Sequence, residues 1–186
     1  IPEVTIGIIG AGRIGGRVLR RLAAFGTPRI LVNDIHPRLK IAPELKLEWV
    51  DKDTIYKEAD LISLHVPLTA QTKNMIKKEQ LSKMKPDAMI INTARGGIIN
   101  EDDLAAVLNA GHLSGAAIDV FNQEPYTGAL AKIDRCLLTA HMGSMSIDCR
   151  TRMEIEATEE AIRFLKGMSL KNLVPFSEYD VQAQEG

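Results

Sequence analysis

Short apolar runs rich in β-branched residues alternate along the chain with segments of helical periodicity, and this alternation limits the possible folds more than any other feature. The runs predict seven strands, at residues 4–9, 30–33, 45–50, 61–66, 88–93, 116–120 and 137–139. Several runs are apolar throughout, which is typical of parallel strands covered on both faces. The alternation therefore predicts an α/β fold with a doubly wound parallel sheet, whose ligand crevice lies outside the carboxyl ends of the strands.

The segments of helical periodicity predict helices at residues 13–24, 101–109 and about 146–166. Asn100 is placed to cap the second helix and Gly111 to end it, because these residue types favour those positions. The third helix has an apolar stripe that includes Met153 and Phe164, and we expect this stripe to lie in the core.

The composition argues against several classes of function. The 186 residues include 23 basic and 24 acidic ones, and a formal net charge of −1 gives no electrostatic reason to expect binding to nucleic acid or a membrane surface. The apolar runs are strand-sized, and the first residues lack the features of a signal peptide. Cys136 and Cys149 form no metal or redox motif, and two isolated thiols suit a reducing cytosol, although a disulfide between them stays open. We therefore expect a cytoplasmic domain without a metal site.

The hexapeptide GAGRIG follows the first predicted strand and begins the first predicted helix. In such a loop Gly10 permits a tight turn, Gly12 lets the backbone approach a pyrophosphate, and Gly15 lets helix and strand pack closely. The amino end of the helix offers free N–H groups and a positive dipole end to the phosphates. The pattern predicts a Rossmann-like dinucleotide site, and the alternative is a strand–helix turn without a ligand.

Asp34 lies nineteen residues beyond Gly15, at the end of the second predicted strand. A carboxylate there can bind the ribose hydroxyls of NAD and repels the additional phosphate of NADP. Arg38 lies close by and could reach that phosphate, so the sequence favours NAD without deciding the question. Asp34 on its own could also be only a turn residue.

The later strands end in polar residues as well. Thr72, Arg95, Asp119 with Glu124, and His141 each follow an apolar run. Because the carboxyl ends of parallel strands share one edge of a sheet, we expect these side chains to gather where the cofactor binds.

Five motifs together carry a resemblance to a known family: GAGRIG, HVPLTAQTK, NTARGGIINEDDL, GAAIDVFNQEP and TAHMGS. In this order they resemble the D-isomer-specific 2-hydroxyacid dehydrogenases, which include phosphoglycerate and glycerate enzymes. The resemblance implies that Arg95 binds the substrate carboxylate and helps polarise the keto oxygen. It implies that His141 gives and takes the proton and that Glu124 is its carboxylate partner. Ala140 departs from the family, which usually has proline before the histidine.

The resemblance also implies NAD as the cofactor, with Asp119 near the nicotinamide carboxamide and Thr72 and Thr93 in the cofactor cleft. The complete set of residues expected to bind the cofactor is Gly10, Gly12, Arg13, Ile14, Gly15, Asp34, Val66, Pro67, Thr72, Thr93, Ala94, Asp119, His141 and Gly143.

The residue types agree with this chemistry. Histidine, with an unperturbed pKa of about 6.5, can exchange a proton near neutral pH, and a carboxylate beside it orients the ring and favours its protonated form. Arginine offers a planar fork that matches a carboxylate. Each residue also has a structural interpretation: Arg95 could pair with a structural acid, Glu124 could be a solvated turn residue, and His141 could cap the helix that follows.

The family resemblance further implies a second, discontinuous substrate domain, most of which we expect to be absent from this chain. We expect residues 1–168 to form the dinucleotide-binding domain and 169–186 a tail that begins the return to the substrate domain. The expected function is reversible oxidation of a small D-2-hydroxy acid to a 2-oxo acid, weak or absent in this chain alone, with a possible homodimer through the nucleotide domain. The alternative is an NAD(H)-sensing binding protein of the same fold, such as a corepressor. A methyltransferase is disfavoured because its motifs are missing.

Overall fold

The computed structural model describes residues 3–26, 28–37 and 41–173. The chain divides into two compact units, of which the first extends to Ala140 and the second begins at His141. Within the described part of the chain, no helix is both long and apolar enough to cross a membrane. Both cysteines are free.

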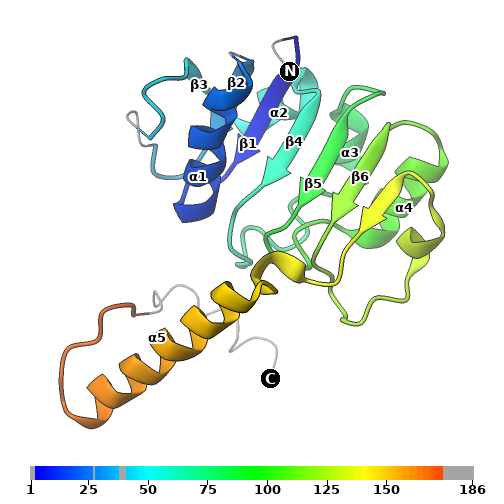
Figure 1. Cartoon of the computed structure of the whole chain (residues 1–186). Helices are drawn as coiled ribbons and strands as arrows, with labels where there is room; N and C mark the ends of the chain where they lie inside the picture. The colour runs from blue at the N-terminus through cyan, green and yellow to red at the C-terminus, as the bar shows by residue number, and fades with distance from the viewer. Residues whose placement is uncertain (1–2, 27, 38–40, 174–186) are drawn as a thin grey trace. The chain divides into compact units, whose positions relative to one another are not determined.

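The first unit is built on one parallel sheet of seven strands, drawn as arrows in Figure 1. The strands are β1 (Thr5–Ile9), β2 (Arg29–Asn33), β3 (Leu47–Trp49), β4 (Leu61–Leu64), β5 (Met89–Asn92), β6 (Gly115–Ile118) and β7 (Cys136–Leu138). Their order in the sheet is β3-β2-β1-β4-β5-β6-β7, so the order reverses between β1 and β4. Each strand overlaps one of the seven predicted runs, which confirms the Rossmann-like doubly wound fold.

Helices connect most of these strands. They are α1 (Arg13–Leu22), the short 3-10 helix η1 (Ala23–Phe25), α2 (Lys52–Glu58), α3 (Lys78–Lys83), α4 (Glu101–Asn109) and the 3-10 helix η2 (Ala129–Lys132). The predicted helices 13–24 and 101–109 are confirmed. The sequence reading did not predict α2 and α3.

The core forms two clusters because β1 points alternate side chains to opposite faces of the sheet. Ile8 packs in one cluster with Leu19 of α1. Ile9 packs in the other cluster with Ile55 of α2 and Leu104 of α4. All five side chains are almost completely buried. Both faces of the sheet are thus covered by buried side chains, and the loops at its carboxyl edge begin from this packed core.

The second unit contains the 3-10 helix η3 (Met142–Ser144) and the long helix α5 (Ile147–Leu165). The side chain of Ser146 accepts a hydrogen bond from the backbone N–H of Cys149 at 3.2 Å and so caps α5. No residue of α5 is buried, so the expectation that its apolar stripe lies in the core is wrong for this structure. Of the expected tail 169–186, residues 174–186 lie outside the described residues.

Candidate cofactor and active site

The glycine loop between β1 and α1 is shaped by close backbone contacts. Gly10 has φ +95° and donates a hydrogen bond from its N–H to the carbonyl of Asn33 at 2.8 Å. A Cβ at Gly10 would lie 2.7 Å from the backbone of His65, and a Cβ at Gly15 would overlap the carbonyl oxygen of Gly10. A Cβ at Gly12 would have no atom within 4 Å. The loop is therefore packed tightly below Gly10 and Gly15 and open at Gly12.

Asp34 joins this loop to the end of β2. One oxygen of its carboxylate accepts from the N–H of Ala11 at 2.6 Å, and the other accepts from the N–H of His36 at 2.7 Å. The carboxylate thus lies next to the amino end of α1, as the dinucleotide pattern predicts. Arg13 and Ile14 are the first exposed residues of the helix. Arg38, the residue that left NADP open, lies outside the described residues.

Thr72 closes the loop after β4. Its hydroxyl donates to the carbonyl of Pro67 at 2.6 Å and accepts from the N–H of Thr69 at 2.7 Å. Val66 and Pro67 lie on the same loop, directly after His65, whose backbone lies against Gly10. The carboxyl end of β4 therefore lies beside the glycine loop, at the point where the strand order reverses. His65 itself is partly buried, and burial lowers the pKa of its imidazole.

Arg95 is exposed just beyond the carboxyl end of β5. Its Nη1 donates to the carbonyl of Ala94 at 2.6 Å, and no ion pair within the described part of the chain joins it to an acid. The alternative of a structural acid as its partner is therefore not supported. The cation remains accessible to an anion from outside, next to Thr93, which is also exposed.

The turn that presents Arg95 is organised by Asn92, a residue that the sequence reading did not single out. Asn92 is 2% exposed. Its Nδ2 donates to the carbonyl of Arg95 at 2.9 Å, and its Oδ1 accepts from the N–H of Ala94 at 3.1 Å. Both polar groups of this buried amide thus fix the Arg95 turn. The only signal in the sequence was an asparagine at the end of an apolar strand.

Two glycines then carry the backbone away from Arg95. Gly97 has φ +77°, and a Cβ at Gly96 would overlap the carbonyl oxygen of Phe121. The loop after β5 therefore lies directly against the loop after β6. This close approach explains why two glycines follow the arginine.

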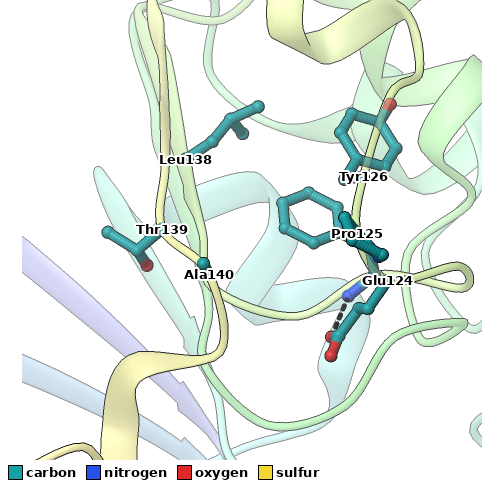
Figure 2. Close-up of a pocket in the computed structure, with 7 residues that line it drawn as sticks. Glu124, Pro125, Tyr126, Leu138, Thr139 and Ala140 are labelled. Atoms are coloured by element: carbon teal, nitrogen blue, oxygen red, sulfur yellow. Dashed lines mark hydrogen bonds between the residues drawn. The ribbon is translucent and has the colours of Figure 1, made fainter.

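The loop after β6 carries Asp119 and Glu124. Asp119 is 7% exposed, and its Oδ1 accepts from the hydroxyl of Thr139 at 2.5 Å. Glu124 is exposed, and its Oε1 accepts from the N–H of Phe121 at 3.1 Å. The carboxylate of Glu124 is thus folded back onto its own loop, as the dashed line in Figure 2 shows.

A cavity of about 540 Å³ opens beside Glu124. Figure 2 shows Glu124, Pro125 and Tyr126 on one side of it and Leu138, Thr139 and Ala140 on the other. The ring of Phe121 stacks on that of Tyr126, with centroids 4.2 Å apart. The walls are mainly apolar, so the carboxylate of Glu124 is the charged group of this cavity.

His141 and Gly143 lie at the start of the second unit. His141 is exposed and has the left-handed conformation, with φ 53° and ψ 51°. Such a conformation is uncommon for residues other than glycine and is frequent at functional sites. Because Ser146 caps α5, the alternative in which His141 is the helix cap is wrong.

Comparisons with known proteins agree with this geometry. Residues 1–143 match the family described as "D-isomer specific 2-hydroxyacid dehydrogenase, NAD binding domain". The chain is 41% identical to a glyoxylate reductase of Thermofilum pendens, over 89% of the chain and 50% of that protein. It is 39% identical to a hydroxypyruvate reductase of Thermotoga maritima, over 87% of the chain and 53% of that protein.

Solved structures give the same result. A D-lactate dehydrogenase of Lactobacillus jensenii with NAD⁺ has a TM-score of 0.81 and 30% identity, covering 92% of this chain and 56% of that one. The chain thus spans about half the length of the relatives it matches. The expected cofactor, NAD, and the resemblance drawn from the five motifs are both confirmed. The chain belongs to the NAD-binding domain family of the D-isomer-specific 2-hydroxyacid dehydrogenases.

Proposed function

We propose that this chain is the cofactor-binding part of an enzyme that interconverts a D-2-hydroxy acid and a 2-oxo acid. One observation carries the proposal: Arg95 is exposed beyond the carboxyl end of β5, and no acid pairs with it in the described part of the chain. Its neighbours at that edge are the ends of β4 and β6. A planar cation so placed suits the carboxylate of a small acid.

The residues of the glycine loop fit the dinucleotide. The open space beside Gly12 leaves room for a pyrophosphate at the amino end of α1, and the carboxylate of Asp34 suits the ribose hydroxyls. Thr72, Thr93, Ala94 and Asp119 complete the proposed cofactor cleft. When bound, NAD supplies or accepts the hydride.

The chain's own residues would bind, orient and exchange a proton. Arg95 holds the substrate carboxylate and polarises the keto oxygen. His141 donates a proton to the oxygen on C2 during reduction and removes it during oxidation. Glu124, held by the N–H of Phe121, orients the imidazole and fixes its tautomer.

The same proposal covers the wider organisation. Residues 1–168 would be the dinucleotide-binding domain, followed by a tail at 169–186, and the nucleotide domain would form the dimer contact. The names of the relatives make glyoxylate and hydroxypyruvate the first substrates to test.

Titration with NADH and NADPH tests the proposal directly. We expect NADH to bind about tenfold or more tightly than NADPH, because Asp34 binds ribose hydroxyls and repels a phosphate. Asp34→Ala should weaken NADH binding, whereas Asp34→Asn should keep an acceptor for Ala11 and mainly reduce the discrimination against NADPH. Asp87→Ala, an exposed site before β5, is the matched control. The absence of binding to either nucleotide would overturn the proposal.

A further inference from the structure

Two loops at the carboxyl edge interlock. The loop after β5 carries Arg95, and the loop after β6 carries Glu124. They meet at Gly96, which lies against the carbonyl oxygen of Phe121. They meet again at Gly97, where an added Cβ would lie 2.8 Å from the Oδ1 of Asn122. The residues proposed for substrate binding and for acid–base chemistry thus lie on two loops that pack directly against each other.

Glu101 bonds the second loop to the helix that follows the first. It is the first residue of α4, and its Oε1 accepts from the N–H of Asn122 at 2.7 Å, across 21 positions of sequence. The side chain is partly buried, and this burial raises the pKa of its carboxyl. A short hydrogen bond from an amide to a partly buried carboxylate is stronger than one between neutral groups.

The contacts continue from Asn122 to Glu124. Asn122 follows Phe121, and the N–H of Phe121 donates to Glu124 Oε1 at 3.1 Å. Figure 2 marks this bond beside the cavity. Glu101 therefore fixes the backbone that in turn fixes the carboxylate of Glu124.

A simpler role for Glu101 is to favour the dipole of α4. The first turn of α4 also holds Asp102 and Asp103, and an acid anywhere in that turn stabilises the helix. The bond to Asn122 is different, because it depends on the length of the Glu101 side chain. Asp102 is exposed in the same turn and shares the dipole effect, but the bond to Asn122 is made by Glu101.

We propose that Glu101 is a positioning residue for the acid–base pair, because its carboxylate clamps the loop of Phe121 and Glu124 to the start of α4. The role rests on the proposed function of Glu124. Loss of the Glu101 carboxylate would leave the glycine loop intact, but the side chain of Glu124 would no longer be held in one orientation.

The test uses NMR on the complete 186-residue chain with two readouts. One is the amide exchange rate of Phe121, which reports the bond to Glu124. The other is the pattern of ring ¹⁵N shifts of His141, which reports the tautomer that Glu124 is proposed to fix. We expect Glu101→Ala to accelerate Phe121 exchange about tenfold or more and to mix the His141 tautomers.

Three matched variants separate positioning from helix stability. Glu101→Asp keeps the charge and the dipole effect but is one methylene too short, so it should behave like Glu101→Ala even if the alanine variant folds poorly. Glu101→Gln keeps the acceptor oxygen and the reach of the side chain but loses the charge, so it should change both readouts clearly less than Glu101→Asp does. Asp102→Ala removes only a dipole charge and should change neither.

Glu124→Gln distinguishes the two ways in which the idea can fail. If Glu124→Gln mixes the His141 tautomers and the Glu101 variants do not, the positioning role is overturned and the proposed function stands. If Glu124→Gln leaves the His141 signals unchanged, the acid–base pair itself is wrong, and the role of Glu101 falls with it.

Discussion

The glycines of the loop between β1 and α1 differ in what surrounds them. Gly15 has no space for a side chain, because a Cβ would overlap the carbonyl oxygen of Gly10. Gly12 faces open space and has φ −70°, outside the left-handed region that favours glycine. Gly15 is therefore needed for the fold of the loop, whereas Gly12 is needed only if a ligand approaches.

Alanine substitutions should separate these requirements. We expect Gly15→Ala to lower the thermal midpoint of unfolding, because overpacking typically costs about 1–3 kcal/mol. Gly12→Ala should leave that midpoint unchanged and weaken NADH binding by about tenfold or more, because the methyl group would occupy the approach to the pyrophosphate. Thermal unfolding and NADH titration of both variants check this. Unchanged NADH affinity in Gly12→Ala would contradict the proposed pyrophosphate position.

The sequence predicted the residues that end a strand with a recognisable chemical type, such as Asp34 and Arg95. It missed Asn92 and Glu101. The bond of Glu101 to Asn122 joins the start of α4 to the loop after β6, across 21 positions of sequence, so no local pattern indicates it. The role of Asn92 depends on the conformation of the turn that follows it, and the residue type asparagine does not indicate that conformation.

At the scale of elements, long periodic segments and capping chemistry were good predictors. The side chain of Asn100 accepts from the N–H of Asp103 at 2.9 Å, and Gly111 has φ +78° just past α4, as expected. The helices α2 and α3 were missed because they have only 7 and 6 residues, too few to show a period. The cap of α2, in which Asp51 accepts from the N–H of Thr54 at 2.7 Å, was the available signal.

Asp60 joins three strands at the amino edge of the sheet, opposite the site. Its carboxylate accepts from the N–H of Thr5 at 2.7 Å and from the Nζ of Lys85 at 2.6 Å. Its carbonyl accepts from the N–H of Met89 at 2.9 Å, so β1, β4 and β5 meet there. The bond with Lys85, followed by that with Thr5, lowers the pKa of the Asp60 carboxyl.

This lowered pKa makes a prediction about acid stability. The contribution of Asp60 is complete above the pKa of an unfolded aspartate, about 3.9, and is lost as the pH falls through the lower folded value. Asp60→Asn should therefore lower the free energy of unfolding at pH 7 by about 1 kcal/mol, after allowance for partial exposure, and the difference from the unmodified chain should shrink below about pH 4. Urea unfolding at several pH values measures it, with Asp87→Asn as the control. A difference that stays constant down to about pH 2 would contradict the assignment.

At the scale of the molecule, the two ends of the parallel strands differ. Asp60 links strands at their amino ends, and the proposed functional residues lie at their carboxyl ends. The carboxyl edge of the first unit holds the glycine loop, the Arg95 turn and the Glu124 loop, and both Arg95 and Glu124 are exposed there. The chain spans about half the length of its relatives. Water has free access to Arg95, the residue proposed to bind the substrate carboxylate. Water at this position weakens both the electrostatic binding of the substrate and the hydride transfer.

We therefore expect the 186-residue chain to bind NADH but to reduce glyoxylate with a kcat/KM about 100-fold or more below that of a form extended to the length of the relatives, because closure over a bound substrate excludes water. Consumption of NADH by both forms measures this, and Arg95→Ala in the extended form should remove most of its activity. Full turnover by the 186 residues would show that no further segment is needed. NADH binding without turnover of any 2-oxo acid in either form would instead favour an NAD(H)-sensing protein, in which Arg95 and His141 persist without their chemistry.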